Sequence, residues 1–260
     1  MGKLSLILII SSICAVNFLG GCTIKIFDNS NVCNAYTYKC MEVEEFDSIQ
    51  MDVDTVNVSI KESDKCKIEY NLLLSSDAEE QNNTVCESKQ GVLTFKLPKD
   101  FIKVNNTDQY VNIFVNPYKK LNNCNINMNV GNLHCSEKIE IGDNLNINCN
   151  VGDIKISNCK SENVKITNGV GDINISGNIY GKDIISVGVG NVKLNLLNSL
   201  QDYSYFLKSG VGKIIINGQK STSNTITGDV LEGNSFHDDR RLEVNVNTGN
   251  ISVNKLSVKI

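Results

Sequence analysis

The chain has 260 residues, a formal net charge of −4 at pH 7, a sequence isoelectric point near 5.3 and no tryptophan. A chain of this length can bury a substantial core in one or two domains. Its acidic balance argues against a nucleic-acid partner, because a protein that binds the phosphate backbone presents a basic face.

Residues 1–21 have the features of a lipoprotein signal peptide. Lys3 is followed by an apolar run over residues 4–16, which is short for a membrane span but fits the hydrophobic part of a signal sequence. The run ends in Leu19-Gly20-Gly21-Cys22, which resembles the cleavage motif of bacterial lipoproteins. Cys22 would then carry the lipid, and two or three acyl chains anchor a protein stably. The sequence therefore predicts anchorage on the extracytoplasmic face of the cell membrane, and an ordinary secretory signal is the alternative.

Residues 22–41 are predicted to form a tether. The stretch Asp28-Asn29-Ser30-Asn31 is polar and favours turns. We expect this segment to hold the folded part of the chain away from the lipid headgroups.

Residues 42–120 are predicted to hold an initial coil and a hairpin or cap. Apolar and polar residues alternate over residues 49–60, and Asp54-Thr55 takes the place of a corner glycine found in later units. The strand-like segments 67–74 and 91–97 are expected to pair with each other as a hairpin.

A repeat of about 20 residues organises residues 121–260. Each unit has a corner of the type Val151-Gly152-Asp153-Ile154, and apolar residues recur five positions before and two and four positions after the glycine. We expect the corner to need a positive φ or a close approach of two backbones, either of which favours glycine. The corner glycines are Gly131, Gly152, Gly171, Gly190, Gly212 and Gly249.

The repeat predicts an all-β fold: a single-stranded parallel β-helix, or β-solenoid, with about 20 residues per coil and an N-terminal hairpin excursion. Successive coils would stack about 4.8 Å apart and place like residues in ladders. A β-sandwich is the alternative, but it does not require like residues at matched positions in successive units. Residues 218–241 break the period and are predicted to form a loop or hairpin. We expect residues 42–260 to form one continuous domain.

Eight of the 10 cysteines lie beyond the signal segment and the proposed anchor. An even number in an exported chain permits disulfides. Cys66 and Cys86 flank the predicted hairpin, and Cys33 and Cys40 could close a small loop. No pair has the C-x-x-C spacing of metal or redox motifs, so no metal site is expected. Two further cysteines fall at inward ladder positions and are predicted to fill core layers: Cys135 and Cys149.

The sequence contains no set of residues that points to a catalytic site. Its only histidines are His134, predicted to point outward, and His237, in the irregular segment. The predicted outward acids Asp153, Asp172 and Glu140 do not single out a pair suited to glycoside cleavage. The period is too long for calcium-binding nonapeptide rolls. We therefore expect no enzyme activity, no metal and no cofactor.

Four sequence features resemble the putative-adhesin family of bacterial β-solenoid envelope lipoproteins, a domain of unknown function. They are Phe46-Asp47-Ser48-Ile49, Gly91-Val92-Leu93-Thr94-Phe95, Val111-Asn112-Ile113-Phe114-Val115-Asn116-Pro117 and the glycine corners. The family pattern has Val-Pro where this chain has Val115-Asn116-Pro117. The resemblance, which runs from Phe46 through Ile251, implies a β-solenoid and an adhesive role, and it supplies no catalytic residues.

Together these features favour an exported, lipid-anchored envelope protein whose solenoid is a non-enzymatic binding module for a protein or glycan ligand. An envelope-stress sensory or regulatory lipoprotein is the alternative, since the acidic balance suits cationic ligands. A polysaccharide-active β-helix enzyme is the third hypothesis. Such sites usually combine basic residues with calcium-binding acids, and the sequence has no such cluster.

Overall fold

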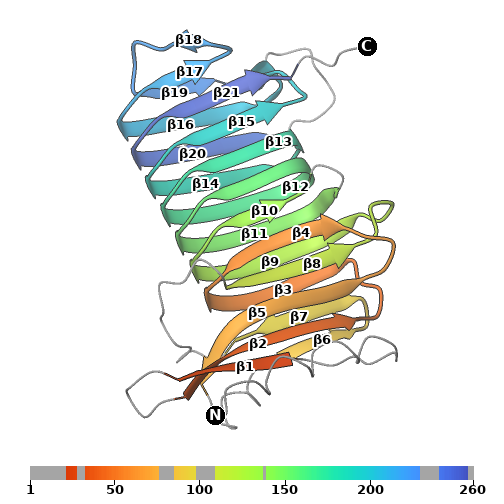
Figure 1. Cartoon of the computed structure of the whole chain (residues 1–260). Coiled ribbons are helices and arrows are strands. Elements are labelled where there is room, and N and C mark those ends of the chain that lie inside the picture. The colour runs from red at the N-terminus through yellow and green to blue at the C-terminus, as the bar shows by residue number, and fades with distance from the viewer. Residues whose placement is uncertain are drawn as a thin grey trace, which may run out of the picture.

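The computed structural model describes residues 22–27, 33–75, 85–97, 109–136, 139–228 and 240–256. Over these residues the chain is all β apart from one 3-10 turn, which confirms the predicted class. The strands form a single curled sheet of 21 members (Figure 1). The first ten are β1 (Cys22–Phe27), β2 (Cys33–Glu42), β3 (Ser48–Thr55), β4 (Asn57–Glu62), β5 (Lys67–Ser75), β6 (Val85–Lys89), β7 (Val92–Lys96), β8 (Tyr110–Val115), β9 (Leu121–Val130) and β10 (Leu133–Cys135).

The remaining elements complete the column. They are β11 (Ile141–Val151), β12 (Ile154–Val170), β13 (Ile173–Ile179), β14 (Lys182–Val189), β15 (Val192–Leu196), the 3-10 turn η1 (Leu200–Asp202), β16 (Ser204–Val211), β17 (Ile214–Ile216), β18 (Gln219–Lys220), β19 (Thr225–Gly228), β20 (Arg241–Thr248) and β21 (Ile251–Lys255). Each strand–corner–strand unit is called a coil below.

Parallel pairing joins each coil to the next at matched positions of the repeat. Ile147 of β11 lies opposite Ile126 of β9 and Ile166 of β12, and Ile166 in turn lies opposite Ile185 of β14. These isoleucines are buried, while the polar residues between them face outward. Burying each such side chain contributes roughly 1.5–3 kcal/mol to folding. The core is thus a continuous column of aliphatic ladders.

Spatial order differs from sequence order at both ends of the column, which corrects the expected stacking of successive units. Before the corner, the strands lie in the order β7, β3, β9, β11, β12, β14, β20 and β16. After the corner, the order is β8, β4, β10, β12, β13, β15, β21 and β17. The first coil, β3–β4, and the last coil in sequence, β20–β21, are therefore each one position in from an end (Figure 1).

The predicted pairing of residues 67–74 with 91–97 is wrong. Strand β5 instead runs antiparallel to β8 and β2, whereas β7 pairs with β3 and β6. Alternating apolar residues mark both segments as strands but do not identify their partners. The antiparallel strands β5 and β6 lie at the N-terminal end of the column, and β18 and β19 lie at the other end against β17 and β16.

The predicted tether is also largely strand in the described residues. Strands β1 and β2 form an antiparallel pair, and β2 pairs with β5 from Asn34 to Glu42. The segment therefore extends the sheet at the N-terminal end of the column (Figure 1). The backbone groups of β2 gain hydrogen-bond partners on the edge of β5, which favours a strand over a free tether there. Residues 1–21, the predicted signal peptide, lie outside the described residues.

Candidate functional site

The six predicted corner glycines lie in one row at the corners of the column. Their φ angles run from +133° to +158°. A Cβ atom on any of them would lie between 1.8 and 2.1 Å from a carbonyl oxygen of the neighbouring coil. Both requirements exclude a side chain at these positions. In the first coil the corresponding corner residue is Val56, whose carbonyl lies beneath Gly131, rather than the expected Asp54-Thr55.

The residue after the corner ties one coil to the next in every coil whose corner the structure describes except the one with its corner at Gly212, where that residue is Lys213. In the other coils its side-chain oxygen accepts the backbone N–H of the equivalent residue one coil further, as Asp153 accepts from Asp172 at 2.8 Å and Asp172 from Asn191 at 2.7 Å. The same bond links Asn57 to Asn132, Asn132 to Asp153, Asn191 to Asn250 and Asn250 to Lys213. The outward acids Asp153 and Asp172 are therefore part of the scaffold.

Eight asparagines form an array on the outer face of two adjacent coils. They alternate with buried residues, so all eight point to the same side. We call this array the asparagine grid. Its members are Asn123, Asn125, Asn127 and Asn129 on β9 and Asn144, Asn146, Asn148 and Asn150 on β11.

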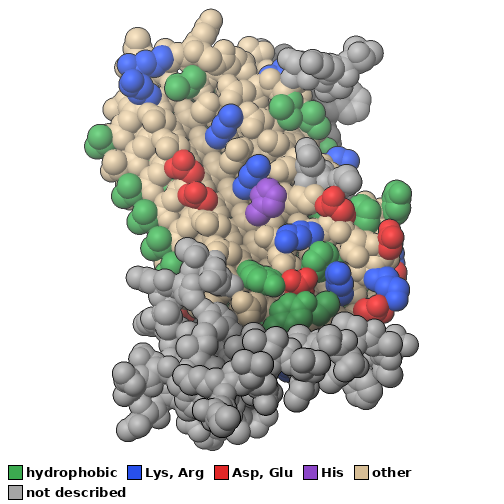
Figure 2. Space-filling model, in the orientation of Figure 1, with side chains coloured by type: hydrophobic (Ala, Val, Ile, Leu, Met, Phe, Trp, Pro, Cys, Tyr) green, Lys and Arg blue, Asp and Glu red, His purple; other side chains and the backbone are tan. Residues whose placement is uncertain are grey.

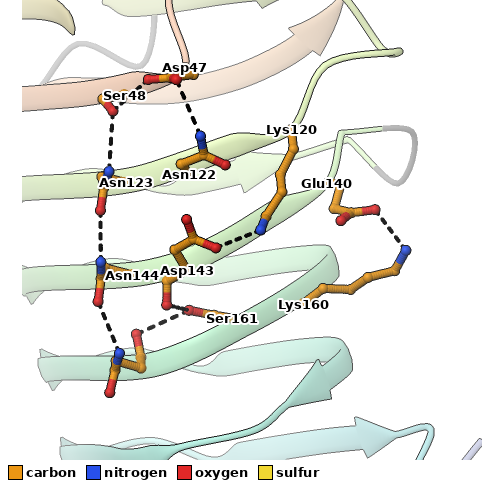
Figure 3. A network of polar contacts seen from close by, with 11 residues as sticks. Asp47, Ser48, Lys120, Asn122, Asn123, Glu140, Asp143, Asn144, Lys160 and Ser161 are labelled. Carbon is orange, nitrogen blue, oxygen red and sulfur yellow. Dashed lines mark hydrogen bonds and ion pairs between the residues drawn. The ribbon is translucent and has the colours of Figure 1, made fainter.

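Amide hydrogen bonds run across the grid from coil to coil. Each β11 asparagine donates its Nδ2 to the Oδ1 of its β9 partner, at distances of 2.7, 3.2, 2.9 and 2.8 Å along the strand. On the other side of β9, three of the four columns continue to β3: Asn123 donates to Ser48, Asn125 to Gln50 and Asn129 to Asp54. Figure 3 shows the first column from Ser48 through Asn123 to Asn144. These bonds hold the amides in fixed orientations.

One rung of the grid is open. Asp52 of β3 lies in register with Asn127 of β9, yet no hydrogen bond joins their side chains in the described part of the chain. The exposed Asp52 carboxylate and the Asn127 Nδ2 group thus face outward as an unused acceptor and an unused donor. We call this pair the open rung.

A shallow cavity lies over the open rung. It measures about 300 Å³ and is lined by polar groups of three coils, with nearly buried apolar side chains beneath them. The polar lining comes from Asp52, Asp54, Asn127, Asn129, Asn148 and Asn150, and the apolar lining from Val53, Leu97 and Met128.

A second cavity of about 390 Å³ lies beside the start of the first coil, but its charges are already paired. Lys119 forms an ion pair with Glu45, and Lys120 contacts Asp143 at 2.5 Å. Figure 3 shows Lys120 reaching across to the next coil, with Lys160 bound to Glu140 at 2.7 Å beside it. Hydrogen bonding to Asp143 raises the pKa of Lys120. Glu140, an acid considered from sequence, is therefore held in a surface ion pair.

The two cysteine pairs considered from sequence are not brought together. Cys66 and Cys86 are both free, and the Sγ of Cys86 lies 3.7 Å from the Sδ of Met41. Cys33 and Cys40 lie seven residues apart on the single extended strand β2, a separation of about 23 Å at the usual rise of a strand. A disulfide requires Cα atoms within about 7 Å, so this strand geometry forbids the bridge.

The core cysteines are inward-facing, as predicted. Cys135 and Cys149 are buried, and Cys124 and Cys159 join them in the core. Burial raises the pKa of the Cys135 and Cys159 thiols to about 12 and also raises the pKa of Cys124. Thiols protonated to this degree are poor nucleophiles. These residues act as small apolar side chains in the core.

The remaining candidates that the structure describes do not lie together as a catalytic site. His134 faces outward in register with Ser59 and Lys155, and its imidazole is the purple group in Figure 2. His237 lies outside the described residues. Among the described residues, no group of three or more His, Cys, Asp or Glu side chains is placed to hold a metal ion. No described helix is long and apolar enough to cross a membrane.

Cys22, the predicted lipid site, is the first residue of β1 and lies opposite Tyr38 of β2. Sequence reasoning missed Asp52 and Asn127. The signal available was the regular alternation of asparagine with apolar residues over 123–129 and 144–150. That alternation indicates that the amides share one outward face. It does not predict the open rung, because the open rung depends on which strand lies next to β9.

The family model described as Toastrack DUF4097 matches residues 46–255, which confirms the resemblance predicted over nearly the same span. A solved "putative cell adhesion protein" from Clostridium sporogenes is 18% identical, with a TM-score of 0.46, over 85% of this chain and 100% of that one. A "putative adhesin" from Bacteroides fragilis is 16% identical, with a TM-score of 0.35, over 84% and 96% of the two chains.

A "putative lipid binding protein" from Parabacteroides distasonis is 15% identical, with a TM-score of 0.34, over 89% of this chain and 99% of that one. No curated protein matches the chain. The identities and TM-scores of all three solved structures are too low to transfer an activity or a ligand.

Proposed function

Because the chain belongs to the Toastrack DUF4097 family over residues 46–255, we propose that it is a cell-envelope protein whose β column is a non-enzymatic binding module. We take the scaffold to be a single-stranded parallel β-helix of about 20 residues per coil, on the strength of the parallel registers between coils. The observation that carries the proposal is the asparagine grid with its open rung and cavity.

Fixed polar groups on a rigid face favour binding over catalysis. The grid amides are oriented by their neighbours, so little side-chain freedom is lost when a ligand docks. Each amide offers a donor and an acceptor but is a poor acid, base or nucleophile. Asp52 has no histidine, lysine or cysteine beside it in the cavity lining to act as a catalytic partner.

The binding proposal is tested with a panel of soluble wall polymers, glycans and envelope proteins. The full chain carrying Cys22→Ser, which lacks the lipid acceptor, is compared with the same chain carrying Asp52→Ala and Asn127→Ala. We expect saturable binding to at least one panel member and a loss of at least about tenfold in affinity in the double variant. If the double variant bound with the same affinity, the asparagine grid would not be the binding site.

We further propose that the protein is exported and anchored through a lipid on Cys22. The lipoprotein-like motif that ends at Cys22 supports this, as does the position of Cys22 at the N-terminal end of the column. The β1–β2–β5 pairing would hold the column close to the membrane instead of on a long tether.

Cell fractionation tests the anchor. We expect the wild-type chain in the membrane fraction and the Cys22→Ser variant in the soluble extracytoplasmic fraction, because the thiol is the acyl acceptor. Cys40→Ser, on the adjacent strand, is the matched control and should fractionate as wild type. If Cys22→Ser remained in the membrane fraction, lipid anchorage at this residue would be refuted.

A further inference from the structure

We propose that the open rung binds an uncharged, hydroxyl-rich glycan chain. The inference rests on the proposed binding function and names the ligand class of the same site. Asp52 and Asn127 lie in register on neighbouring coils, which in a sheet are about 4.8 Å apart. Their side chains could have bonded to each other, as Asn129 bonds to Asp54 two residues further along both strands, but they do not.

The chemistry of the open rung complements a hydroxyl group. An ionised carboxylate only accepts hydrogen bonds, and an amide nitrogen only donates them. A sugar hydroxyl does both, so it can donate to Asp52 and accept from the Nδ2 of Asn127. Bonds to a charged acceptor are the stronger kind. A hydroxyl of the ligand would therefore bridge Asp52 and Asn127, the two side chains of the open rung that do not bond to each other.

Neighbouring groups extend this surface beyond one hydroxyl. The Oδ1 atoms of Asn148 and Asn150 accept no side-chain hydrogen bond in the described part of the chain, and both residues line the cavity. Val130 and Val151 border the grid at the corner and are 38% and 44% exposed. A column of hydrophobic side chains runs along this edge of the molecule in Figure 2. Mixed polar and apolar surface suits sugar rings, which present both hydroxyls and C–H faces.

Other ligand classes fit the site less well. A hard cation such as Ca²⁺ takes six to eight oxygen ligands, and no metal-holding group of acids is present among the described residues. Strands β3, β9 and β11 use their backbone groups in the ladders on both sides, so an extended peptide cannot add to the sheet here.

Charge argues against an acidic polymer. Asp52 and Asp54 both line the cavity and would repel an anionic chain. The cation in register beside Asp52 is Lys96 of β7, which is exposed and does not line the cavity. The local field therefore favours neutral sugars over uronic acid polymers.

The test measures binding of three soluble probes to the full chain carrying Cys22→Ser, by titration calorimetry. Hexamers of N-acetylglucosamine represent wall glycans, hexamers of mannose represent other neutral glycans, and polygalacturonic acid is the charged probe. We expect saturable binding of a neutral hexamer and much weaker binding of polygalacturonic acid. Asp52→Ala should weaken neutral binding about tenfold or more, since a bond to a charged acceptor is lost.

Glu243→Gln is the matched control. Glu243 is a carboxylate on the same outward face of β20, three strands beyond β11, and it does not line the cavity. The variant should bind as wild type. Failure of both neutral hexamers to bind, or equal binding by Asp52→Ala, would overturn the glycan assignment. If another member of the wider panel bound in an Asp52-dependent manner, the binding function would stand and the glycan class would be wrong.

Discussion

At the residue scale, two kinds of position define the column: positions that leave no room for a side chain, and positions whose side chain must accept a hydrogen bond. The corner glycines belong to the first kind, because a Cβ atom there would collide with a carbonyl of the neighbouring coil. The corner Asp and Asn residues belong to the second, because their oxygens satisfy a backbone N–H one coil away. Each requirement acts between coils.

Substitution of a corner glycine tests the first requirement. Gly152→Ala should lower the free energy of unfolding by about 3 kcal/mol or more, since the new methyl group would sit 1.8 Å from the carbonyl oxygen of Gly131. Gly218 is the control: its φ is also positive, at +80°, but a Cβ there meets nothing within 4 Å. Gly218→Ala should cost only about 1 kcal/mol. Urea unfolding curves would measure both losses of unfolding free energy. Equal losses in the two variants would contradict a collision between the Cβ atom at position 152 and the neighbouring coil.

Asp183 predicts a pH dependence of stability. Its side chain is fully buried, and it accepts the backbone N–H of Val164 at 2.9 Å while its Oδ2 has no partner. Burial raises the pKa of the carboxyl from 3.8 to about 7, although the N–H groups of Val164 and Gly181 oppose the shift. The unfolded chain therefore releases this proton at lower pH than the folded chain. The stability that this carboxyl contributes is therefore fully present below about pH 4 and is lost as the pH rises to about 7.

The expected loss for Asp183 between pH 5 and pH 8 is up to about 3 kcal/mol. Asp183→Asn should remove most of this dependence, because the amide stays neutral throughout. Asp64→Asn, at an exposed acid, is the control and should keep the wild-type slope. Thermal or urea unfolding across this range measures the effect, and an unchanged slope in Asp183→Asn would show that another group is responsible.

At the element scale, the coils are held in register by their corner bonds as much as by the aliphatic ladders. The row of side-chain acceptors runs from Asn57 to Asn250 and ends at Lys213, which has no oxygen to offer. Lys213 precedes Asn250 in sequence but belongs to β16–β17, the outermost coil in space. Among the described residues no further coil stacks beyond it, so an acceptor at this position would have no corner N–H to bind.

Alanine at two corner positions tests this account. Asp172→Ala should cost about 1–2 kcal/mol of unfolding free energy, because the N–H of Asn191 loses its 2.7 Å acceptor. Asp172→Asn retains an acceptor and should restore most of the loss. Lys213→Ala should stay within about 0.5 kcal/mol of wild type. Denaturant midpoints provide the measurement. A loss of unfolding free energy in Lys213→Ala comparable to that in Asp172→Ala would contradict a row of corner acceptors that ends at Lys213.

At the scale of the whole molecule, the chain folds back at both ends so that neither its first nor its last coil is outermost. Strands β20 and β21 lie between β14–β15 on one side and β16–β17 on the other. Antiparallel strands then lie against the outer coils: β6 and β5 at one end, β19 and β18 at the other. This arrangement covers edges that would otherwise be open to pairing with other chains.

Truncation tests the folded-back end. Removing residues 240–260 should leave β16 and β17 without their parallel partners and expose their amides to rapid hydrogen exchange. Strands β9 and β11 serve as the internal control, because coils in a column contact only their neighbours and these two should remain protected. Retained protection of β16 in the truncated chain would contradict the pairing with β20.

The sequence alone determined the local features of this protein. Alternating apolar residues fixed which side chains are buried, the repeated glycines marked the corners, and inward Cys135 and Cys149 followed from the same pattern. These features depend on strand geometry and on contacts that recur in every coil. The environment of a residue in one coil therefore predicts the environment of the equivalent residue in the next coil.

Only the tertiary structure decided the order of the coils, the partners of β2, β5 and β7, and the interrupted amide column at Asp52 and Asn127. Every coil presents similar hydrogen-bonding edges, so the repeat itself does not say which edge a strand will join. The strand that joins then places particular side chains opposite each other. The candidate binding site follows from those placements.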